Sequence, residues 1–358
     1  MRVPHQRSNP LKPTAGLSGA LSESPKIRPL RQAQGRWGTR LFSLSAILIF
    51  SCILHQGMAP MAHAQPSQPK QLVIIDTDIG DDIDDAFAIG LALQSPEFRI
   101  LGITTAFGDT AMREQLVMKF LVATGFETVP VAAGVPTQPK TTFTQMLYTT
   151  GGQLIPAQRL SGPDFILDEI RKHPGQITLI AIGPQTNLGA AIVKDPATFR
   201  KLKRIVMMGG SVYKGYKGGA PDPEWNILCD IPAAQKVFRS GVPLYVMPLD
   251  ATILKLEPEP LQKLFDDHTP LTDQIHMLYD EWSGNTKQET PTLFDPMAVG
   301  YAARPELCPT TALHLIVDDK GFTRPEPGPP NAQVCLKANT EAFYPFVLNR
   351  LESPLRDR

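Results

Sequence analysis

The sequence contains one short stretch, "IIDTDIGDDIDDAF", whose residue types could do chemistry. Six carboxylates lie within ten positions of it: Asp76, Asp78, Asp81, Asp82, Asp84 and Asp85. At a spacing of about 4 Å and an effective dielectric constant near 20, each pair of like charges repels by on the order of 4 kcal/mol. Either the side chains spread into water or a positive group lies among them. Because the nearby donors are all oxygens, a hard cation such as Ca²⁺ is favoured over Zn²⁺.

The elements around this stretch predict where it lies in the fold. The run "QLVIID" (71–76) is typical of a buried strand, and "DDAFAIGLALQ" (84–94) of a helix. Similar apolar runs alternate with helical segments along the chain, which predicts one α/β domain with an open, mostly parallel twisted sheet flanked by helices. Asp76 and Asp78 are two positions apart, so we expect them to face the same side. The carboxylates then lie at the carboxyl end of the first strand, where such sheets bind ligands.

Three other interpretations of the stretch explain less of it. An EF-hand loop fails because Gly80 occupies its fifth position and Phe87 its twelfth. An aspartyl-phosphate hydrolase would use Asp76 as nucleophile and Asp78 as acid, but it leaves "DDA" unexplained. An acidic helix cap with a solvated turn accounts for two or three of the aspartates and not for six.

The first 64 residues have the pattern of a secretory signal region. They hold eight of the 35 basic residues and one of the 35 acidic residues, so the rest of the chain carries 27 against 34, a net charge of −7. Arg36 and Arg40 precede an apolar run, Leu41 to Leu54, and "AHA" (62–64) offers a cleavage site. An N-terminal membrane anchor is the alternative. We expect residues 65–358 to form an exported catalytic domain, periplasmic or extracellular.

Charge and cysteine content narrow the partners and the redox chemistry. An acidic body disfavours nucleic-acid polymers and anionic membranes as partners. We expect a small-molecule substrate, no stable membrane insertion after cleavage, and a homo-oligomer. Residues 65–358 contain three cysteines, Cys229, Cys308 and Cys335, and no C-x-x-C motif. An odd number in a large domain favours isolated buried thiols, and a Cys308–Cys335 disulfide is the alternative.

Several blocks of the sequence together carry a family resemblance. "DTDIGDDIDDAFAI" resembles the amino-terminal fingerprint of the inosine–uridine-preferring nucleoside hydrolases. "LGITTAFGD" (101–109), "AIGPQTNLGAAI" (181–192), "MMGGSV" with "PEWNI" (223–227), and "FDPMAV" (294–299) are similar to further blocks of that family, in the same order. The resemblance implies a nucleoside-hydrolase-like fold. It also implies Ca²⁺-dependent hydrolysis of the N-glycosidic bond of ribonucleosides, which releases ribose and free base.

The same resemblance implies roles for individual residues. The implied metal ligands are the carboxylates of Asp78, Asp85 and Asp295 and the carbonyl of Ile182. Residues implied to bind the sugar are Asp84, Glu224 and Asn226. Asp78 is also implied to be the general base toward the attacking water.

Departures from the family pattern concern the substrate. Ile79 replaces the fingerprint's Pro, and two extra residues follow Gly80, so Asp81 or Asp82 is a further candidate ligand. Asp109 and Gly218 stand where the family has substrate-binding Asn residues, and we expect Asp109 to contact the substrate. Phe294 replaces the His implicated in protonating the leaving base; it can stack on a base but donates no proton. His276 and Tyr279 are candidates for a substitute acid, and Trp282 is a candidate for stacking on the base. The alternative is that these three residues form one packed helical face.

These departures leave two alternatives to a nucleoside hydrolase. One is a hydrolase of another N-ribosyl compound, since the altered residues reshape the pocket. The other is a non-catalytic periplasmic protein that binds ribose or nucleosides. Retention of Asp78 and Asp295 disfavours the second alternative, because a binding protein needs no general base.

Overall fold

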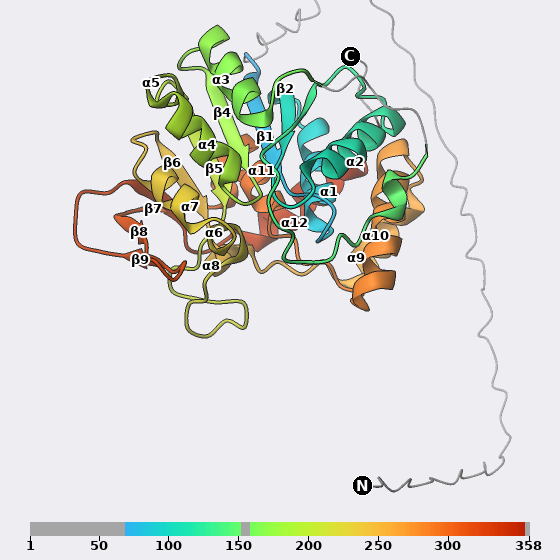
Figure 1. Ribbon diagram of the computed structural model, residues 1–358. Coiled ribbons are helices and arrows are strands. Elements are labelled where there is room, and N and C mark those ends of the chain that lie inside the picture. Colours follow the sequence, from blue (N-terminus) through green and yellow to red (C-terminus); the bar gives the residue numbers. More distant parts are fainter. Residues whose placement is uncertain (1–68, 152–157, 355–358) are drawn as a thin grey trace, which may run out of the picture. The chain divides into compact units, whose positions relative to one another are not determined.

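The computed structural model describes residues 69–151 and 158–354, so the expected signal region lies outside the described residues. Its main feature is an eight-stranded sheet in the order β3-β2-β1-β4-β5-β6-β10-β7 (Figure 1). All neighbouring strands are parallel except β7, which runs antiparallel to β10 at one edge. The predicted fold class, an open and mostly parallel sheet flanked by helices, is confirmed.

The strands and helices alternate along most of the chain. The strands of the main sheet are β1 (Gln71–Thr77), β2 (Phe98–Thr105), β3 (Val131–Ala133), β4 (Ile177–Ala181), β5 (Arg204–Met208), β6 (Leu244–Met247), β7 (Thr310–Leu313) and β10 (Ala332–Cys335). A separate hairpin pairs β8 (Leu315–Val317) with β9 (Thr323–Pro325). The helices are α1 (Asp84–Leu93), α2 (Thr110–Ala123), α3 (Gly162–Lys172), α4 (Thr186–Lys194), α5 (Pro196–Phe199), α6 (Trp225–Leu228), α7 (Ile231–Phe238), α8 (Leu249–Thr252), α9 (Pro258–Asp266), α10 (Pro270–Thr286), α11 (Pro296–Ala303) and α12 (Thr340–Leu351). Two 3₁₀ turns, η1 (Leu147–Thr149) and η2 (Pro305–Leu307), complete the set.

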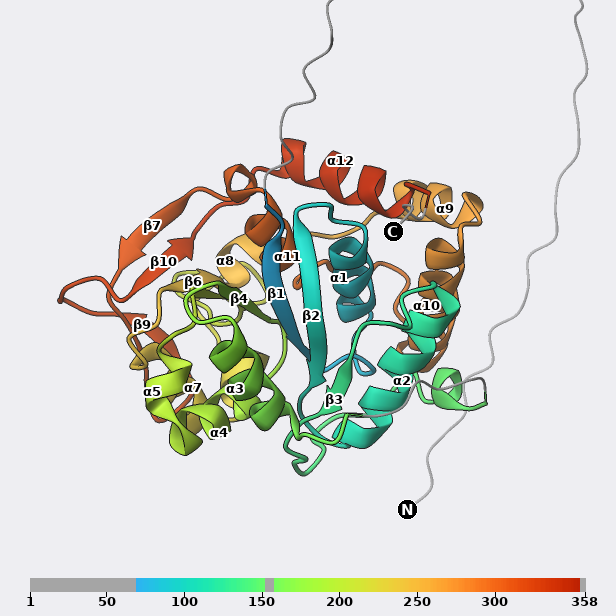
Figure 2. The ribbon, with the colours of Figure 1, turned by 90° about the horizontal axis from the view of Figure 1, so that it is seen from above.

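The central strand β1 is buried on both faces because its side chains alternate between two apolar cores. Val73 and Ile75 belong to the core formed with α1, α2 and α10–α12, whereas Ile74 belongs to the core formed with α3, α4 and α7. The two groups of helices flank the strands (Figure 2). A strand buried on both faces is rigid, so the residues that follow its carboxyl end are held firmly in place.

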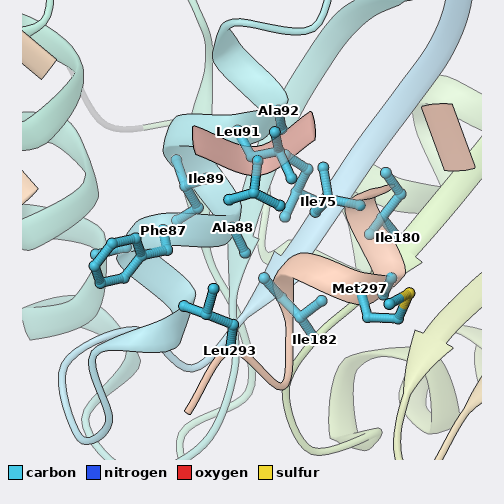
Figure 3. Close-up of a cluster of buried hydrophobic side chains, with 14 of the residues drawn as sticks. Ile75, Phe87, Ala88, Ile89, Leu91, Ala92, Ile180, Ile182, Leu293 and Met297 are labelled. Atoms are coloured by element: carbon cyan, nitrogen blue, oxygen red, sulfur yellow. The ribbon is translucent and has the colours of Figure 1, made fainter. Parts of the chain in front are cut away.

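An apolar layer supports the segments that carry the acidic residues. Figure 3 shows Ile75 of β1 and Ile180 of β4 packed with Met297 of α11 and with the apolar side chains of α1. Ile182 and Leu293 belong to the same fully buried core. Ile182 is itself a predicted ligand through its carbonyl, and Leu293 directly precedes Phe294, so packing of this core fixes the backbone of the site.

Two further observations concern the cysteines and the helix lengths. Cys308 and Cys335 form a disulfide with a Cα–Cα distance of 5.6 Å, and Cys229 is free. The preference for isolated thiols at Cys308 and Cys335 was therefore wrong, because residue counting cannot detect that η2 and β10 end side by side. Among the described residues, no helix is both long enough and apolar enough to cross a membrane.

Candidate active site

A cavity of about 560 Å³ opens at the carboxyl ends of the central strands. Asp78 follows β1 in its wall, Ile182 follows β4, and Met208 is the last residue of β5. The chain order reverses between β1 and β4, because β2 and β3 extend the sheet on one side and β4 to β6 on the other. Open α/β sheets bind ligands at such a switch point.

Three buried carboxylates form the floor of this cavity. Asp84, Asp85 and Asp295 each offer one oxygen, and these oxygens all lie within 4.8 Å of one another. The backbone N–H of Asp295 donates to Asp84 Oδ2 at 3.2 Å, and the Thr77 hydroxyl donates to Asp85. Burial, and then repulsion from neighbouring carboxylates, raises the pKa of all three well above the ordinary range. The cluster is thus destabilised by its own charge.

Asp78 lies beside this floor, in the position predicted for the general base. Burial raises the pKa of Asp78 to about 7, although the positive charge of Arg113 opposes the shift. Gly183 passes so close that a Cβ there would lie 2.8 Å from Asp78 N and 2.9 Å from Asp78 Oδ1. Any larger residue at position 183 would displace the Asp78 carboxylate, so glycine is required for this close approach.

The residues present fit a hard divalent cation. Asp85 and Asp295 in the floor, Asp78 beside it and the carbonyl-bearing residue Ile182 all line the same cavity. Among the described residues that line the cavity there is no Lys, Arg or His. Oxygen donors without nitrogen or sulfur are the ligand set that Ca²⁺ and Mg²⁺ prefer.

The sequence did not point to Arg113, which is a buried cation beneath the acidic loop (residues 78–83, between β1 and α1). Its guanidinium donates to the carbonyls of Asp78 and Ile79 and forms an ion pair with Asp81 at 3.0 Å, while Nε donates to the Phe107 carbonyl. Only 2% of the residue is exposed. The sequence signal was an arginine within the buried stripe of α2, but its partner lies 32 positions away. Asp81 is therefore an ion-pair partner of Arg113.

Asp76 does not face the cavity as its spacing from Asp78 predicted. Its carboxylate accepts hydrogen bonds from Thr104 Oγ1 of β2 and from Asn187 Nδ2 of α4, and it is fully buried. The prediction failed because β1 ends at Thr77, so the two-residue alternation does not extend to Asp78. Asp76 joins β1 to β2 and α4, which positions the start of the acidic loop.

The predicted sugar-binding pair, Glu224 and Asn226, also lines the cavity. Glu224 caps α6, where its carboxylate accepts from Asn226 N at 2.9 Å and Gly210 N at 2.8 Å, and burial raises its pKa to about 7. Asn226 Nδ2 donates to the Met208 carbonyl at 3.2 Å. Both residues are nearly fully buried and line the cavity, so their remaining polar atoms are held in fixed directions.

Four aromatic side chains contribute to the lining of the cavity. Phe294 lies there as predicted, edge-on to Tyr216 with ring centroids 6.3 Å apart. Trp282 of α10 also lines the cavity, and Trp225 does so at the start of α6. Tyr216 and Trp225 were not singled out from the sequence, because the loop between β5 and α6 has no periodic pattern that indicates its direction.

Three predicted candidates lie outside the cavity lining. Asp109 is exposed and caps α2, where it accepts from Met112 N at 3.0 Å, so the expectation that it contacts the substrate is corrected: its carboxylate is engaged in a helix cap. His276 stacks on Phe265 with ring centroids 4.1 Å apart. Tyr279 donates its hydroxyl to the Glu289 carbonyl. His276 and Tyr279 therefore belong to a packed helical face, which was the alternative interpretation. Of the three aromatic candidates on this helix, Trp282 lines the cavity.

Comparison with known proteins agrees with this geometry. Residues 73–345 match the family model described as inosine-uridine preferring nucleoside hydrolase. The chain is 33% identical over 253 residues to uridine nucleosidase 1 of Arabidopsis thaliana, covering 66% of this chain and 74% of the relative. It is 31% identical over 302 residues to the non-specific ribonucleoside hydrolase RihC of Salmonella agona, covering 77% and 95%.

Solved structures extend the match to the fold. A plant nucleoside hydrolase, the PpNRh1 enzyme, superimposes with a TM-score of 0.69 at 27% identity, over 80% of this chain and all of that one. The purine-preferring ribonucleoside hydrolase from Gardnerella vaginalis gives 0.68 at 26% identity, over 79% and 98%. Fold and site define a glycosidase that acts on N-ribosyl bonds. The chain belongs to the inosine–uridine preferring nucleoside hydrolase family.

Proposed function

We propose that the protein is a Ca²⁺-dependent hydrolase of the N-glycosidic bond of ribonucleosides, releasing ribose and free base. The observation that carries this proposal is the convergence, in one cavity, of Asp78, the three floor carboxylates and the Glu224–Asn226 pair. These residues come from segments up to 217 positions apart (Asp78 to Asp295). A fold that only needed stability would gain nothing by bringing buried carboxylates together, because their repulsion is unfavourable.

In the proposed reaction, Asp78, Asp85, Asp295 and the Ile182 carbonyl would hold Ca²⁺. The bound cation would make a neighbouring water easier to deprotonate. Asp78 accepts a proton from the attacking water at a carboxylate oxygen, and the water oxygen attacks C1′ of the ribose. Asp84, Glu224 and Asn226 bind the sugar hydroxyls and hold the ring in place. As the bond to the base breaks, positive charge develops on the ribose ring, and the surrounding carboxylates stabilise it.

The assay that tests this proposal is ribose release from a mixed panel of nucleosides, with Ca²⁺, with EDTA, and with EDTA followed by excess Ca²⁺. We expect release that EDTA abolishes and Ca²⁺ restores. Restoration by Mg²⁺ but not by Ca²⁺ would contradict the choice of ion. Tight binding of ribose or nucleoside without turnover would support the non-catalytic binding protein instead.

We also propose that residues 1–64 are a secretory signal region and that the mature enzyme, residues 65–358, is exported and forms a homo-oligomer. The basic leader with its apolar run supports export, and so does the Cys308–Cys335 disulfide, since disulfides persist in oxidising compartments. N-terminal sequencing of protein recovered from the periplasm or medium tests the cleavage site. Size-exclusion chromatography with light scattering tests the oligomer, and a monomeric mass would contradict it.

A further inference from the structure

The lining of the cavity has an unusual chemical composition. Seven carboxylates and four aromatic rings contribute to it: Asp78, Asp81, Asp82, Asp84, Asp85, Glu224 and Asp295, with Tyr216, Trp225, Trp282 and Phe294. The other polar groups that line it are hydroxyls and amides of Thr, Asn and Gln. Among the described residues of this lining there is no His, Lys, Arg or Cys. The cavity is therefore acidic and aromatic, and the side chains among its described lining residues that could donate a proton to a leaving group are carboxyl groups and one phenol. The carboxylates accept hydrogen bonds, form an ion pair with Arg113 or are proposed to hold the cation.

That composition matters because of what cleavage requires. When the bond between C1′ and the base nitrogen breaks, the electron pair goes to the base. A neutral base then leaves as an anion and needs a proton, and a positioned general acid contributes about 10²–10⁴-fold to such a step. A base that is already cationic accepts the pair, becomes neutral and needs no proton.

The one phenol among the described residues of the lining is a poor acid for this role. The Tyr216 hydroxyl accepts a hydrogen bond from Trp225 N at 3.0 Å, and its ring contacts Phe294. Partial burial, and then the charge of Glu224, raises the pKa of Tyr216 above its ordinary value, which makes it a weaker acid. Phe294 itself carries no exchangeable proton.

The lining instead suits a positively charged ring. Aromatic faces attract cations, by about 0.5–2 kcal/mol per contact. The carboxylates of Asp81 and Asp82 lie in the same lining as the aromatic rings, and a cavity lined by one sign of charge concentrates ligands of the opposite sign. Asp81 is ion-paired with Arg113, whereas the described residues show no ion pair for Asp82.

We propose that this site is selective for N-ribosyl compounds whose aromatic base carries a positive charge, such as N-ribosylpyridinium compounds and N7-alkylated purine nucleosides. The inference rests on the proposed function and names its substrate class. In the reaction, the C1′–N bond breaks and its electron pair neutralises the ring. The water oxygen forms the new bond to C1′, and its proton goes to the Asp78 carboxylate. The products are ribose, a neutral base and one proton.

The test compares guanosine with 7-methylguanosine, which differ by one methyl group and one positive charge. Protein purified after expression of the full chain is assayed for ribose release with Ca²⁺, and the rate without protein is subtracted. We expect kcat/KM for 7-methylguanosine to exceed that for guanosine by at least about 100-fold, and its KM to rise with ionic strength. Comparable values for the two compounds would overturn the selectivity and leave the proposed function standing. Hydrolysis of neither would overturn both.

Variants at the aromatic wall test directly whether an added proton donor changes the selectivity. Phe294→His places an imidazole in the lining, so we expect the ratio between the two substrates to contract by at least about 10-fold, through faster guanosine hydrolysis. Phe294→Leu is the matched control, since it removes the ring and adds no donor, and the ratio should not contract. Tyr216→Phe should lower both rates alike. A selective loss of guanosine hydrolysis in Tyr216→Phe would identify Tyr216 as the acid and overturn the inference.

Discussion

Carboxylates lie close together both in the acidic loop and in the cavity floor, but different groups offset their repulsion in the two regions. Asp81 has a cation of the chain itself, since Arg113 pairs with it and Thr141 also donates to it. The floor carboxylates of Asp84, Asp85 and Asp295 have backbone and hydroxyl donors, but the described residues include no cationic side chain bonded to them. One carboxylate is paired with a cation of the chain itself, whereas the other group is a candidate site for a cation from solution.

This difference predicts which acidic residues are structural and which are functional. Arg113 also binds the carbonyls of Asp78 and Ile79, so the Asp81 pair braces the turn that presents Asp78 to the cavity. An uncharged residue of the same shape would support the local structure as well as each floor carboxylate does. Substitutions in the two groups should therefore change activity and stability in different proportions, as the following predictions state.

The largest effect is expected at Asp78, which lies between the two groups. Asp78→Asn keeps the shape and removes the proton acceptor, so we expect kcat to fall by about 10³-fold with little loss of stability. Steady-state kinetics and thermal melts measure the two quantities. The matched control is Asp109→Asn, at an exposed aspartate outside the cavity lining, and activity within about threefold of wild type for Asp78→Asn would contradict its role.

Removal of the internal cation should destabilise the protein most. Arg113→Met leaves Asp81 and three carbonyls, those of Asp78, Ile79 and Phe107, without their donor, and breaking a buried pair in this way costs about 3–5 kcal/mol. We expect a lower midpoint in urea and a lower kcat/KM, since the turn at Asp78 loosens. Arg113→Lys keeps the charge but not the forked geometry, so it should lie between wild type and Arg113→Met. An unchanged unfolding midpoint in Arg113→Met would show that the brace is dispensable.

The strongest test of the comparison is that substitutions in the two groups should change the free energy of unfolding in opposite directions. In EDTA near pH 8, Asp85→Asn relieves repulsion within the floor and should stabilise the protein by on the order of 1–2 kcal/mol. Asp81→Asn deprives Arg113 of its charged partner and should destabilise it by about 2 kcal/mol. With Ca²⁺ added, wild type should gain stability and Asp85→Asn should gain less. Shifts of the same sign in EDTA would refute the distinction between the two groups.

The smallest effect is expected at the helix cap. Asp109→Ala removes the acceptor for Met112 N at the start of α2, so unfolding should become easier by about 1 kcal/mol while KM for nucleosides is unchanged. A rise in KM of tenfold would return Asp109 to the substrate-binding residues.

The fold was predictable because its information is local. Continuous apolar strands alternating with helices specify a covered parallel sheet, and "QLVIID" and "DDAFAIGLALQ" lie within one residue of β1 and α1 as observed. The positions of the floor residues at strand and helix ends follow from the same layout. The edge strand β7 was not predicted, because "TTAL" is short and partly exposed and its antiparallel pairing depends on a distant strand.

The remaining features depend on contacts that spacing does not encode. The hydrogen bonds from Arg113 to Asp78 and Ile79 span 35 and 34 positions, and nothing near "AMREQL" indicates an acidic partner. The direction of Asp76 depended on whether β1 continues one residue further. The loop that carries Tyr216 is fixed by the Asp222 carboxylate, which accepts from Tyr216 N at 2.9 Å, and a bend of this kind has no periodic signature.

Helices α1 and α11 both begin at the cavity floor, one with Asp84 and the other directly after Asp295. A helix N-terminus carries roughly half a positive charge, which belongs to the backbone and cannot dissociate. When a cation leaves, this fixed countercharge stays behind and continues to offset part of the carboxylate repulsion. We therefore expect the protein to stay folded when the cation dissociates and when it binds again.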